Sequence, residues 1–126
     1  MLLVRASAGS SKIHGTGLIA RQFIPAGTIV WKFEPGFDVE MTEEQVKRLS
    51  PTAQEQVLYY AYFHQATKTF VLSSDDDRLT NHSDDPNTRC RGDYTYAVRD
   101  IQEGEEITND YRELVMLNFN QGGVAA

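Results

Sequence analysis

The side chains best suited to chemistry lie together in residues 78–87, RLTNHSDDPN. Asn81, His82 and Ser83 place three hydrogen-bonding side chains in a row. Residues 84–87 predict a sharp turn, because Asp and Asn bond to their own backbone and proline restricts φ. The three polar residues alone would fit a solvated turn equally well. Aliphatic residues border the string, however, so we interpret the whole segment as part of a functional site.

Two further motifs flank this segment in the chain. Residues 12–17, KIHGTG, contain two glycines, which permit positive φ angles and let the backbone approach a ligand. The sequence lacks the third glycine and the following helix of a dinucleotide-binding fingerprint. A tight turn is therefore the alternative to a ligand-binding loop. Residues 104–111, GEEITNDY, end on Asp110 and Tyr111.

The elements that must position these motifs are predicted to be mainly short strands. Turn residues recur about every 8–12 residues between aromatic and β-branched segments, which is typical of a β domain. We expect a mainly β fold with a small helical insert at residues 41–62. The predicted strands are residues 2–6, 18–23, 29–33, 69–72, 88–90 and 94–98.

The helical insert carries two start signals. Thr42 and Gln45 fit a capping box, and Ser50 followed by Pro51 predicts the start of a second helix. The aromatic run at residues 59–63 is expected to be mostly core and part of a hairpin. One or two of its rings would be free to line a channel.

Neither a metal site nor a disulfide is expected. Cys90 is the single cysteine, which excludes a disulfide framework and a cysteine zinc cluster within the chain. Residues 75–77, DDD, lack the spacing and glycine of a calcium loop, so we predict a solvated loop. Arg89 and Arg91 would lower the pKa of Cys90, but no flanking pattern supports a catalytic thiol.

Composition and length set the class of protein. The 126 residues fit one domain, which we assign to residues 1–117, followed by a flexible tail at 118–126. The net charge of −6 and the scattered basic residues disfavour nucleic acid and favour a cationic partner. The sequence has neither the ~20 apolar residues of a membrane span nor a signal peptide. We expect an intracellular protein, in the cytoplasm with the nucleus as the alternative.

Taken in order, HGTG (14–17), RLTNHSDDPN (78–87) and GEEITNDY (104–111) resemble the three motifs of the SET domain, the fold of most protein lysine methyltransferases. The resemblance covers about residues 2–113. It implies a β-clip-like fold of small curved sheets, whose C-terminal segment threads through a preceding loop as a pseudoknot.

The same resemblance implies an S-adenosylmethionine-dependent protein-lysine N-methyltransferase in which Tyr111 carries the catalytic hydroxyl. The cofactor-binding residues would be His14, Gly15, Thr16, Gly17, Arg78, Asn81 and His82. The substrate channel would be lined by Tyr96, Asn109, Tyr111 and Phe119.

The chemistry suits these residue types. A lysine amine must be neutral to attack a methyl group, and with a pKa near 10.4 only about 1 in 2,500 is neutral at pH 7. Desolvation and a nearby positive sulfonium lower that pKa. Water can then carry the proton away, and in-line positioning is the main remaining task.

Several departures from the family pattern bear on activity. Asn109 stands where the family usually has Tyr or Phe, so the number of methyl groups added is left open. Phe33 to Gly36 replace a Tyr-x-Gly motif, and Asp84 replaces a cysteine. The sequence has no cysteine-rich segment to form a zinc-bound channel wall. Phe119 or a second subunit would complete that wall.

Three functions remain open at this point. The first is a methyltransferase acting on a Lys-containing basic protein or peptide, histone-like tails included. The second is a catalytically weak SET-like module that binds a protein partner. The third is a small interaction domain without a cofactor. The oligomeric state is open as well, a dimer included.

Overall fold

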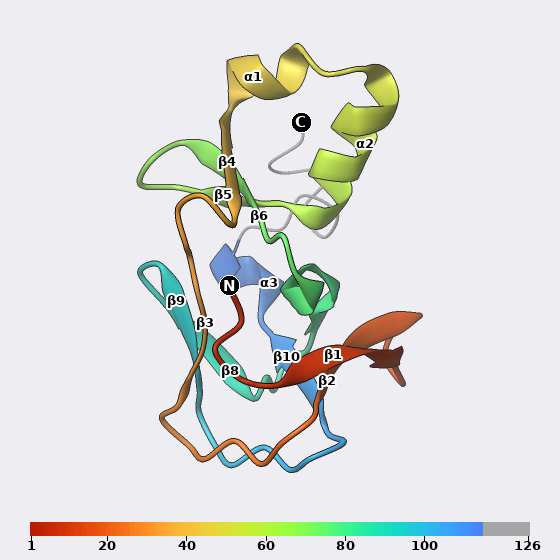
Figure 1. The fold of residues 1–126 in the computed structure, drawn as a ribbon, viewed down its shortest axis with the longest axis vertical. Coiled ribbons are helices and arrows are strands. Elements are labelled where there is room, and N and C mark those ends of the chain that lie inside the picture. The colour runs from red at the N-terminus through yellow and green to blue at the C-terminus, as the bar shows by residue number, and fades with distance from the viewer. Residues whose placement is uncertain (115–126) are drawn as a thin grey trace.

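The three motifs meet in the first of three small sheets (Figure 1). A computed structural model describes residues 1–114. The first sheet contains, in order, β1 (Ala6–Ser10), β2 (Thr16–Ala20), β10 (Glu106–Asn109) and β7 (Asn81–His82). β10 is antiparallel to β2 and parallel to β7, with Asn109 opposite His82. The C-terminal motif thus lies between the glycine motif and the NHS segment, where the resemblance placed the threaded segment.

The second sheet packs on the main hydrophobic core. It contains β3 (Ile29–Lys32), β9 (Tyr94–Ala97) and β8 (Thr88–Arg91), in that order. Ile24 and Ile101, from two separate turns, exchange backbone hydrogen bonds of 2.8 Å in both directions. Both side chains are fully buried beside Leu18 and Ile107. Leu18 and Ile107 belong to strands β2 and β10, so this core holds the first sheet in place.

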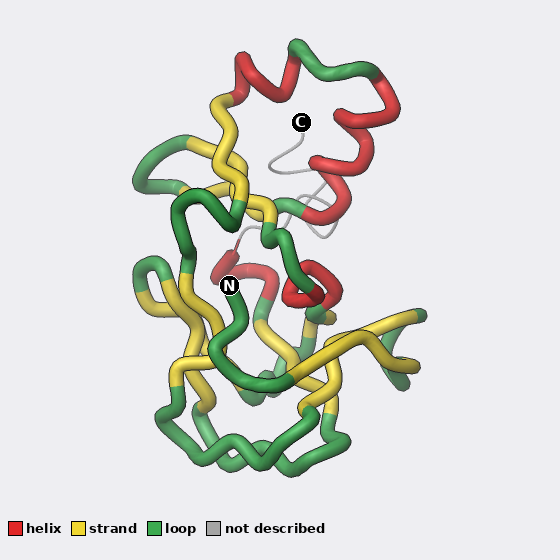
Figure 2. Tube along the Cα trace, in the orientation of Figure 1, coloured by secondary structure: helices red, strands yellow, loops and turns green. Residues whose placement is uncertain are grey.

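The third sheet and the helical insert form the upper part of the molecule (Figures 1 and 2). The elements are β4 (Val39–Thr42), α1 (Glu43–Lys47), α2 (Pro51–Tyr60), β5 (Tyr62–His64) and β6 (Thr69–Leu72), and the strand order is β4-β6-β5. Thr42 and Gln45 form the predicted capping box, and Ser50 caps α2. Val57 and Phe70 belong to a second buried cluster.

The fold class is therefore confirmed as mainly β with small sheets and a helical insert, but several local predictions were wrong. The aromatic run at residues 59–63 is not mostly core, because Tyr59 is exposed and the other rings are only partly buried. Its first two residues end α2, and only the part from Tyr62 onward pairs with β6 as a hairpin.

The predicted strand at residues 2–6 begins only at Ala6, because Leu2 makes an isolated bridge to Trp31 and its amide donates to the Asp75 carboxylate. Residues 75–77 are not a solvated loop. Asp75 caps the 3₁₀ helix η1 (Asp76–Leu79), which leads directly into the NHS segment.

The last described element is α3 (Tyr111–Leu114), which follows β10 directly. Phe119 and the predicted tail at residues 118–126 lie outside the described residues. Within residues 1–114, none of the helices is long and apolar enough to cross a membrane.

Candidate active site

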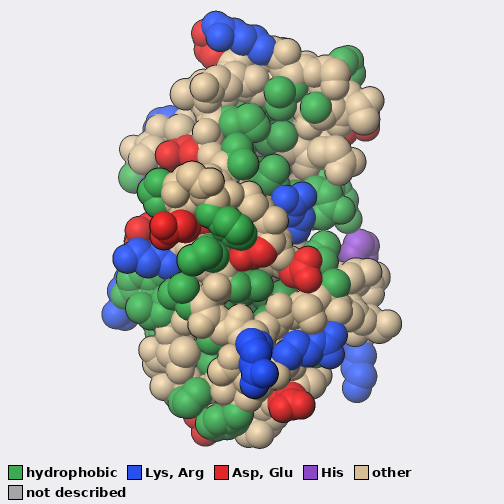
Figure 3. Space-filling model, viewed as in Figure 1, with side chains coloured by type: hydrophobic (Ala, Val, Ile, Leu, Met, Phe, Trp, Pro, Cys, Tyr) green, Lys and Arg blue, Asp and Glu red, His purple; other side chains and the backbone are tan. Residues whose placement is uncertain are grey.

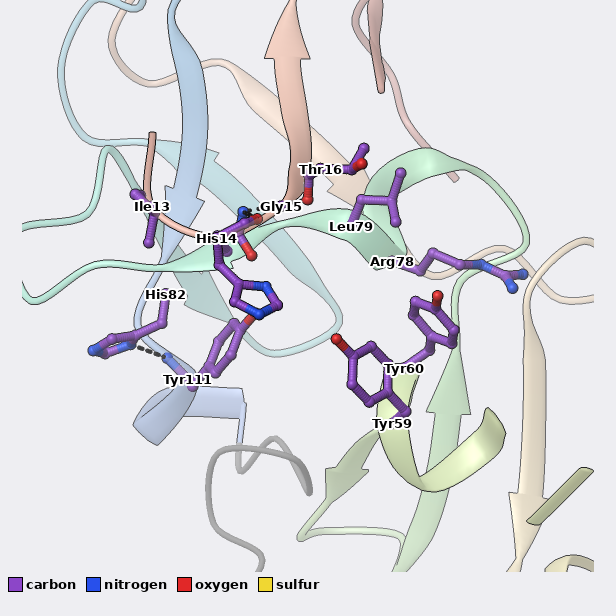
Figure 4. Close-up of a pocket in the computed structure, with 11 residues that line it drawn as sticks. Ile13, His14, Gly15, Thr16, Tyr59, Tyr60, Arg78, Leu79, His82 and Tyr111 are labelled. Carbon is purple, nitrogen blue, oxygen red and sulfur yellow. Dashed lines mark hydrogen bonds between the residues drawn. The ribbon is translucent and has the colours of Figure 1, made fainter. Parts of the chain in front are cut away.

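A cavity of about 700 Å³ lies between the glycine motif, η1 and the end of α2. Figure 4 shows Tyr59 and Tyr60 on one side of it, with His14, His82 and Tyr111 on the other. Backbone from Ile13 to Thr16 forms part of the wall. All three sequence motifs therefore contribute to one cavity, which we call the large cavity.

Asn81 ties the glycine motif to the NHS segment. Its Nδ2 lies 3.1 Å from the carbonyl oxygen of His14 and 3.0 Å from Oε2 of Glu106, with further contacts to Ser11 and Thr16. The Asn81 side chain is buried, so these acceptors hold it in place of water. The amide therefore positions the loop that forms the wall of the large cavity.

Glu106 and Gly17 complete this anchor. The hydroxyl of Ser11 donates to the Glu106 carboxylate at 2.8 Å and accepts the backbone amides of Ile13 and His14. A Cβ on Gly17 would collide with the Glu106 carboxylate and approach the Asn81 amide. Glycine lets the loop, the amide and the carboxylate approach closely, and any side chain here would displace the Glu106 carboxylate from its hydrogen bonds. Glu106 thus contributes to the site by holding the glycine loop in place.

His82 positions the backbone of Tyr111. Its Nδ1 accepts a hydrogen bond of 3.1 Å from the Tyr111 amide (Figure 4). In a neutral imidazole the other ring nitrogen then carries the hydrogen, and Nε2 lies 2.9 Å from Oδ1 of Asp84. The two rings lie with centroids 5.4 Å apart. Asp84, where the family often has cysteine, accordingly accepts from the histidine.

Tyr111 lines the large cavity and is held at its hydroxyl as well. The phenol donates a 2.8 Å hydrogen bond to the backbone carbonyl of Thr80. Burial, with smaller contributions from Tyr59 and Glu106, raises the pKa of Tyr111 to about 12. The phenol is therefore protonated at neutral pH. It can orient a group in the site but cannot serve as a base there.

A second, small cavity of about 30 Å³ adjoins the first. Tyr60 and Arg78 line both cavities. Trp31, Asp77 and Asn109 are among the other residues around the small cavity. Oδ1 of Asn109 is buried and has no hydrogen-bond partner among residues 1–114. An unpaired buried acceptor is costly, and a donor would reach this atom only if the Asn109 side chain turned toward the small cavity.

The family model of the SET domain matches residues 15–112, which include all of β2 to β10. The chain belongs to the SET-domain family. A comparison with curated protein sequences finds no significant match.

Solved structures of SET-domain proteins share the fold at low sequence identity. A Plasmodium falciparum protein described as a putative histone methyltransferase matches with a TM-score of 0.63 at 21% identity, over 87% of this chain and 95% of its own. Apo Polycomb Repressive Complex 2 of Chaetomium thermophilum matches with a TM-score of 0.70 at 20% identity, over 94% of this chain. This SET-domain chain corresponds to only 16% of that longer chain. At these identities the likeness shows the fold alone.

The SET fold brings most of the predicted site residues together. His14, Gly15, Thr16, Arg78, Asn81 and His82 line the large cavity, as does Tyr111. Gly17 lies behind them against Glu106 and Asn81. Asn109 lines the small cavity. Tyr96 lines neither of these two cavities, and its ring lies instead beside the guanidinium of Arg91, 5.0 Å away.

Sequence reasoning did not single out Tyr59, Tyr60, Trp31 or Asp77 as site residues. The aromatic run at 59–63 was the one available signal, since one or two of its rings were expected to line a channel. Trp31 and Asp77 come from segments far apart in the chain. No local pattern marks them, because only the pairing of distant strands brings them to the small cavity.

Cys90 corrects another prediction. It also lines the small cavity, and burial raises the pKa of its thiol to about 11, with Glu113 and Asp93 adding to the effect. The expected lowering by Arg89 and Arg91 does not occur. Arg89 forms ion pairs with Asp110 and Glu113 instead, and Arg91 lies over Tyr96.

Proposed function

We propose that this SET-domain chain is an S-adenosylmethionine-dependent protein-lysine N-methyltransferase. The observation that carries the proposal is the adjacency of the two cavities. They share Tyr60 and Arg78, and the chain passes from one to the other between Asn109 and Tyr111. A methyl donor in the large cavity and an amine in the small one would face each other across this boundary. Such positioning is the main requirement of a direct transfer.

The residues of the large cavity fit the cofactor. Its volume of about 700 Å³ is within the usual range for small-molecule sites. The Arg78 guanidinium can pair with a carboxylate, and the rings of Tyr59 and Tyr60 offer apolar faces to a purine. Gly15, at φ +50°, leaves open space where a side chain would stand. When bound, S-adenosylmethionine supplies a methyl group on a positively charged sulfur.

The chain's own groups would orient the acceptor amine. Asn109 Oδ1 is a buried acceptor without a partner among residues 1–114, so it would accept from an amine N–H once the Asn109 side chain turned toward the small cavity. The neutral phenol of Tyr111, fixed on the Thr80 carbonyl, stands at the boundary between the cavities. The rings of Trp31 and Tyr62, with centroids 6.3 Å apart, line the small cavity and give it apolar walls. Desolvation lowers the pKa of a lysine amine and favours its neutral form.

A lysine in a basic protein or peptide is the substrate class we propose, histone-like tails included. The net charge of −6 favours encounter with a cationic partner. On the face shown in Figure 3, acidic side chains lie across the middle of the molecule. The structural neighbour described as a putative histone methyltransferase supports the same class. We place the reaction inside the cell, as the sequence suggests.

The deciding experiment is transfer of a tritiated methyl group from S-adenosylmethionine to a panel of histones and cell-lysate proteins. We expect label on a protein band with the wild type and its loss with Tyr111→Phe. Tyr94→Phe is the matched control, because Tyr94 lies in β9 and lines neither cavity. Calorimetry with S-adenosylmethionine alone reports cofactor binding. A wild type that neither labels a protein nor binds the cofactor would refute the proposal.

The second candidate function is a protein-binding SET module with weak catalysis. The observation in its favour is Asn109, a small polar residue at a position where the family has Tyr or Phe. Cofactor binding without methyl transfer to any protein in the panel would favour this alternative. Equal labelling by the wild type and Tyr111→Phe would argue against the catalytic role of Tyr111.

A further inference from the structure

The small cavity contains a carboxyl group that the proposed function does not yet use. Asp77 of η1 faces this cavity of about 30 Å³ together with Asn109. Ser73 donates a hydrogen bond of 3.1 Å to Oδ2 of Asp77. No lysine or arginine among residues 1–114 forms an ion pair with this carboxyl group. Within the described part of the chain, the N-terminal amino group of Met1 is the one cation whose charge lowers the pKa of Asp77, and it forms its ion pair with Asp38 instead. A partly buried carboxyl group without a direct ion-pair partner is unusual and suggests a ligand.

The remaining groups of the small cavity select for a cation with several hydrogens. Asn109 borders this space, and its Oδ1 is a buried acceptor that lacks a partner among residues 1–114, although this atom is not itself exposed to the cavity. The rings of Trp31 and Tyr62 border the same space, and aromatic faces attract cations. A cavity of about 30 Å³ holds little more than one water molecule, which is about the size of an ammonium group. One carboxylate and aromatic walls suit an alkylammonium ion.

Charged groups surround Asp77 on several elements. Asp75 precedes it, and Asp38 lies between β3 and β4, where it binds the amino group of Met1 at 2.6 Å. The guanidinium of Arg78 lies over the Tyr60 ring, 5.6 Å from its centroid, while its Nε donates to the Ser73 carbonyl. The negative charges of Asp75 and Asp38, together with burial, disfavour ionisation of the Asp77 carboxyl group.

The pKa of Asp77 differs from the pKa values of the other titratable groups that line the small cavity. Burial raises the pKa of Asp77 to about 7, and the charges of Asp75 and Asp38 add to the rise. The hydrogen bond from Ser73 and the positive charge of the Met1 amino group act in the opposite direction. Burial also raises the pKa of Tyr62 well above its usual value and that of Cys90 to about 11. At pH 7–9 Asp77 is therefore the acid in the small cavity that changes its charge.

We propose that Asp77 is the counter-ion of the substrate lysine ammonium group and accepts its proton before methyl transfer. This inference rests on the proposed function. In the step, an N–H bond of the ammonium group breaks and its electron pair stays on nitrogen. The proton forms an O–H bond with the Asp77 carboxylate, which leaves a neutral amine beside a carboxylic acid. Water takes the proton once the methylated product, again a cation, has formed.

The raised pKa of Asp77 suits it to accept a proton from a lysine ammonium group. An Asp with a pKa of 3.8 would hold a proton about a thousandfold less tightly than one with a pKa of about 7. The higher value brings Asp77 closer to the lysine amine, whose pKa near 10.4 is itself lowered by desolvation. A general base works best when its pKa lies near the operating pH, and a pKa of about 7 meets this condition.

The first test is the pH profile of kcat/KM for Asp77→Asn and the wild type on a substrate peptide. We expect wild-type kcat/KM to rise with pH and level off above about pH 7, as Asp77 ionises. The variant depends on free neutral lysine and should rise about tenfold per pH unit toward pH 10. The loss should be at least about tenfold at pH 7.5 and should shrink at higher pH. An equal loss at every pH would overturn the role of Asp77 as proton acceptor.

Asp76→Asn is the matched control for charge. Asp76 is the neighbouring residue, lines neither cavity, and accepts the backbone amide of Ala8 at 3.0 Å. The Asp76→Asn substitution removes one negative charge from η1, as Asp77→Asn does, so we expect this control variant to keep the wild-type pH profile. A profile for Asp76→Asn like that of Asp77→Asn would assign the effect to net charge and contradict the inference.

A binding measurement keeps the inference testable without activity. NMR titration with n-butylammonium, and with n-butanol as the neutral probe, reports on the small cavity directly. We expect n-butylammonium to bind the wild type at least about tenfold more tightly than Asp77→Asn, and n-butanol to bind both alike. Equal n-butylammonium binding to both proteins would sink the counter-ion role. Binding that depends on Asp77 in a protein without methyl transfer would leave the counter-ion role standing but refute the proposed function and, with it, the proton transfer.

Discussion

The phenol of Tyr111 donates its hydrogen bond to the backbone carbonyl of Thr80, 2.8 Å away and 31 residues earlier in the chain. The same tyrosine gives its backbone amide to Nδ1 of His82. Tyr111 is thus held at both ends by the segment that carries the NHS motif. A side chain fixed in this way loses little freedom when a ligand binds, which is the structural basis of preorganised sites.

Tyr111→Phe should reduce methyl transfer by a factor on the order of a hundred, because the site loses an oriented hydroxyl group. Folding stability should fall by only about 1 kcal/mol, the usual contribution of one hydrogen bond. Initial rates and thermal unfolding, measured beside Tyr94→Phe, check both numbers. A variant that keeps full activity would exclude the hydroxyl from the reaction.

Asn81→Asp should destabilise the protein by about 3 kcal/mol and weaken cofactor binding. It replaces the amide donor of a buried site with a carboxylate that faces Glu106 and the His14 carbonyl. Adding Glu106→Gln removes the like-charge contact and supplies a donor, so the double variant should recover part of the loss. Urea unfolding of the wild type, the two single variants and the double variant gives the coupling energy between Asn81 and Glu106. Strictly additive effects would show that the Asn81–Glu106 contact does not anchor the glycine motif.

Asn109→Ala should allow more methyl groups on the product. The substitution removes the unpaired amide from a cavity of about 30 Å³ and leaves room for a bulkier amine. Stability should change by less than about 1 kcal/mol, because loss of the side chain's packing is offset by removal of an unsatisfied acceptor. Mass spectrometry of a methylated peptide distinguishes the products. An unchanged ratio of mono- to higher methylation would show that Asn109 does not limit the space.

Asp77→Asn should stabilise the protein at pH 8 and leave its stability at pH 4 nearly unchanged. The pKa of Asp77 is about 7 in the folded state against an ordinary value of 3.8, so the folded state binds more protons between these pH values. Wild-type stability therefore falls as pH rises from about 4 to about 7, by about 3 kcal/mol for this group. The Asp77→Asn variant should not show this decrease in stability. Unfolding curves at pH 4, 6 and 8 provide the measurement, and a constant difference at all three would contradict a raised pKa.

The sequence by itself determined the motifs and the class of fold. Turn residues, the Thr42–Gln45 capping box and the alternation of short strands act within a few residues, so their outcome is readable locally. The ordered motifs at 14–17, 78–87 and 104–111 led to the SET domain, which the family match confirms over residues 15–112. Adjacency of His14, Asn81 and Tyr111 followed from that resemblance and not from spacing.

Only the tertiary structure decided which groups share the small cavity and how they ionise. Asp77 belonged to a predicted solvated loop, yet η1 turns it inward beside Asn109 and Trp31. Cys90 lies between two arginines in sequence, yet burial raises its pKa. The physical reason is common to both. Burial and contacts between residues far apart in the chain depend on how the strands pair, and desolvation can then outweigh the charges of sequence neighbours.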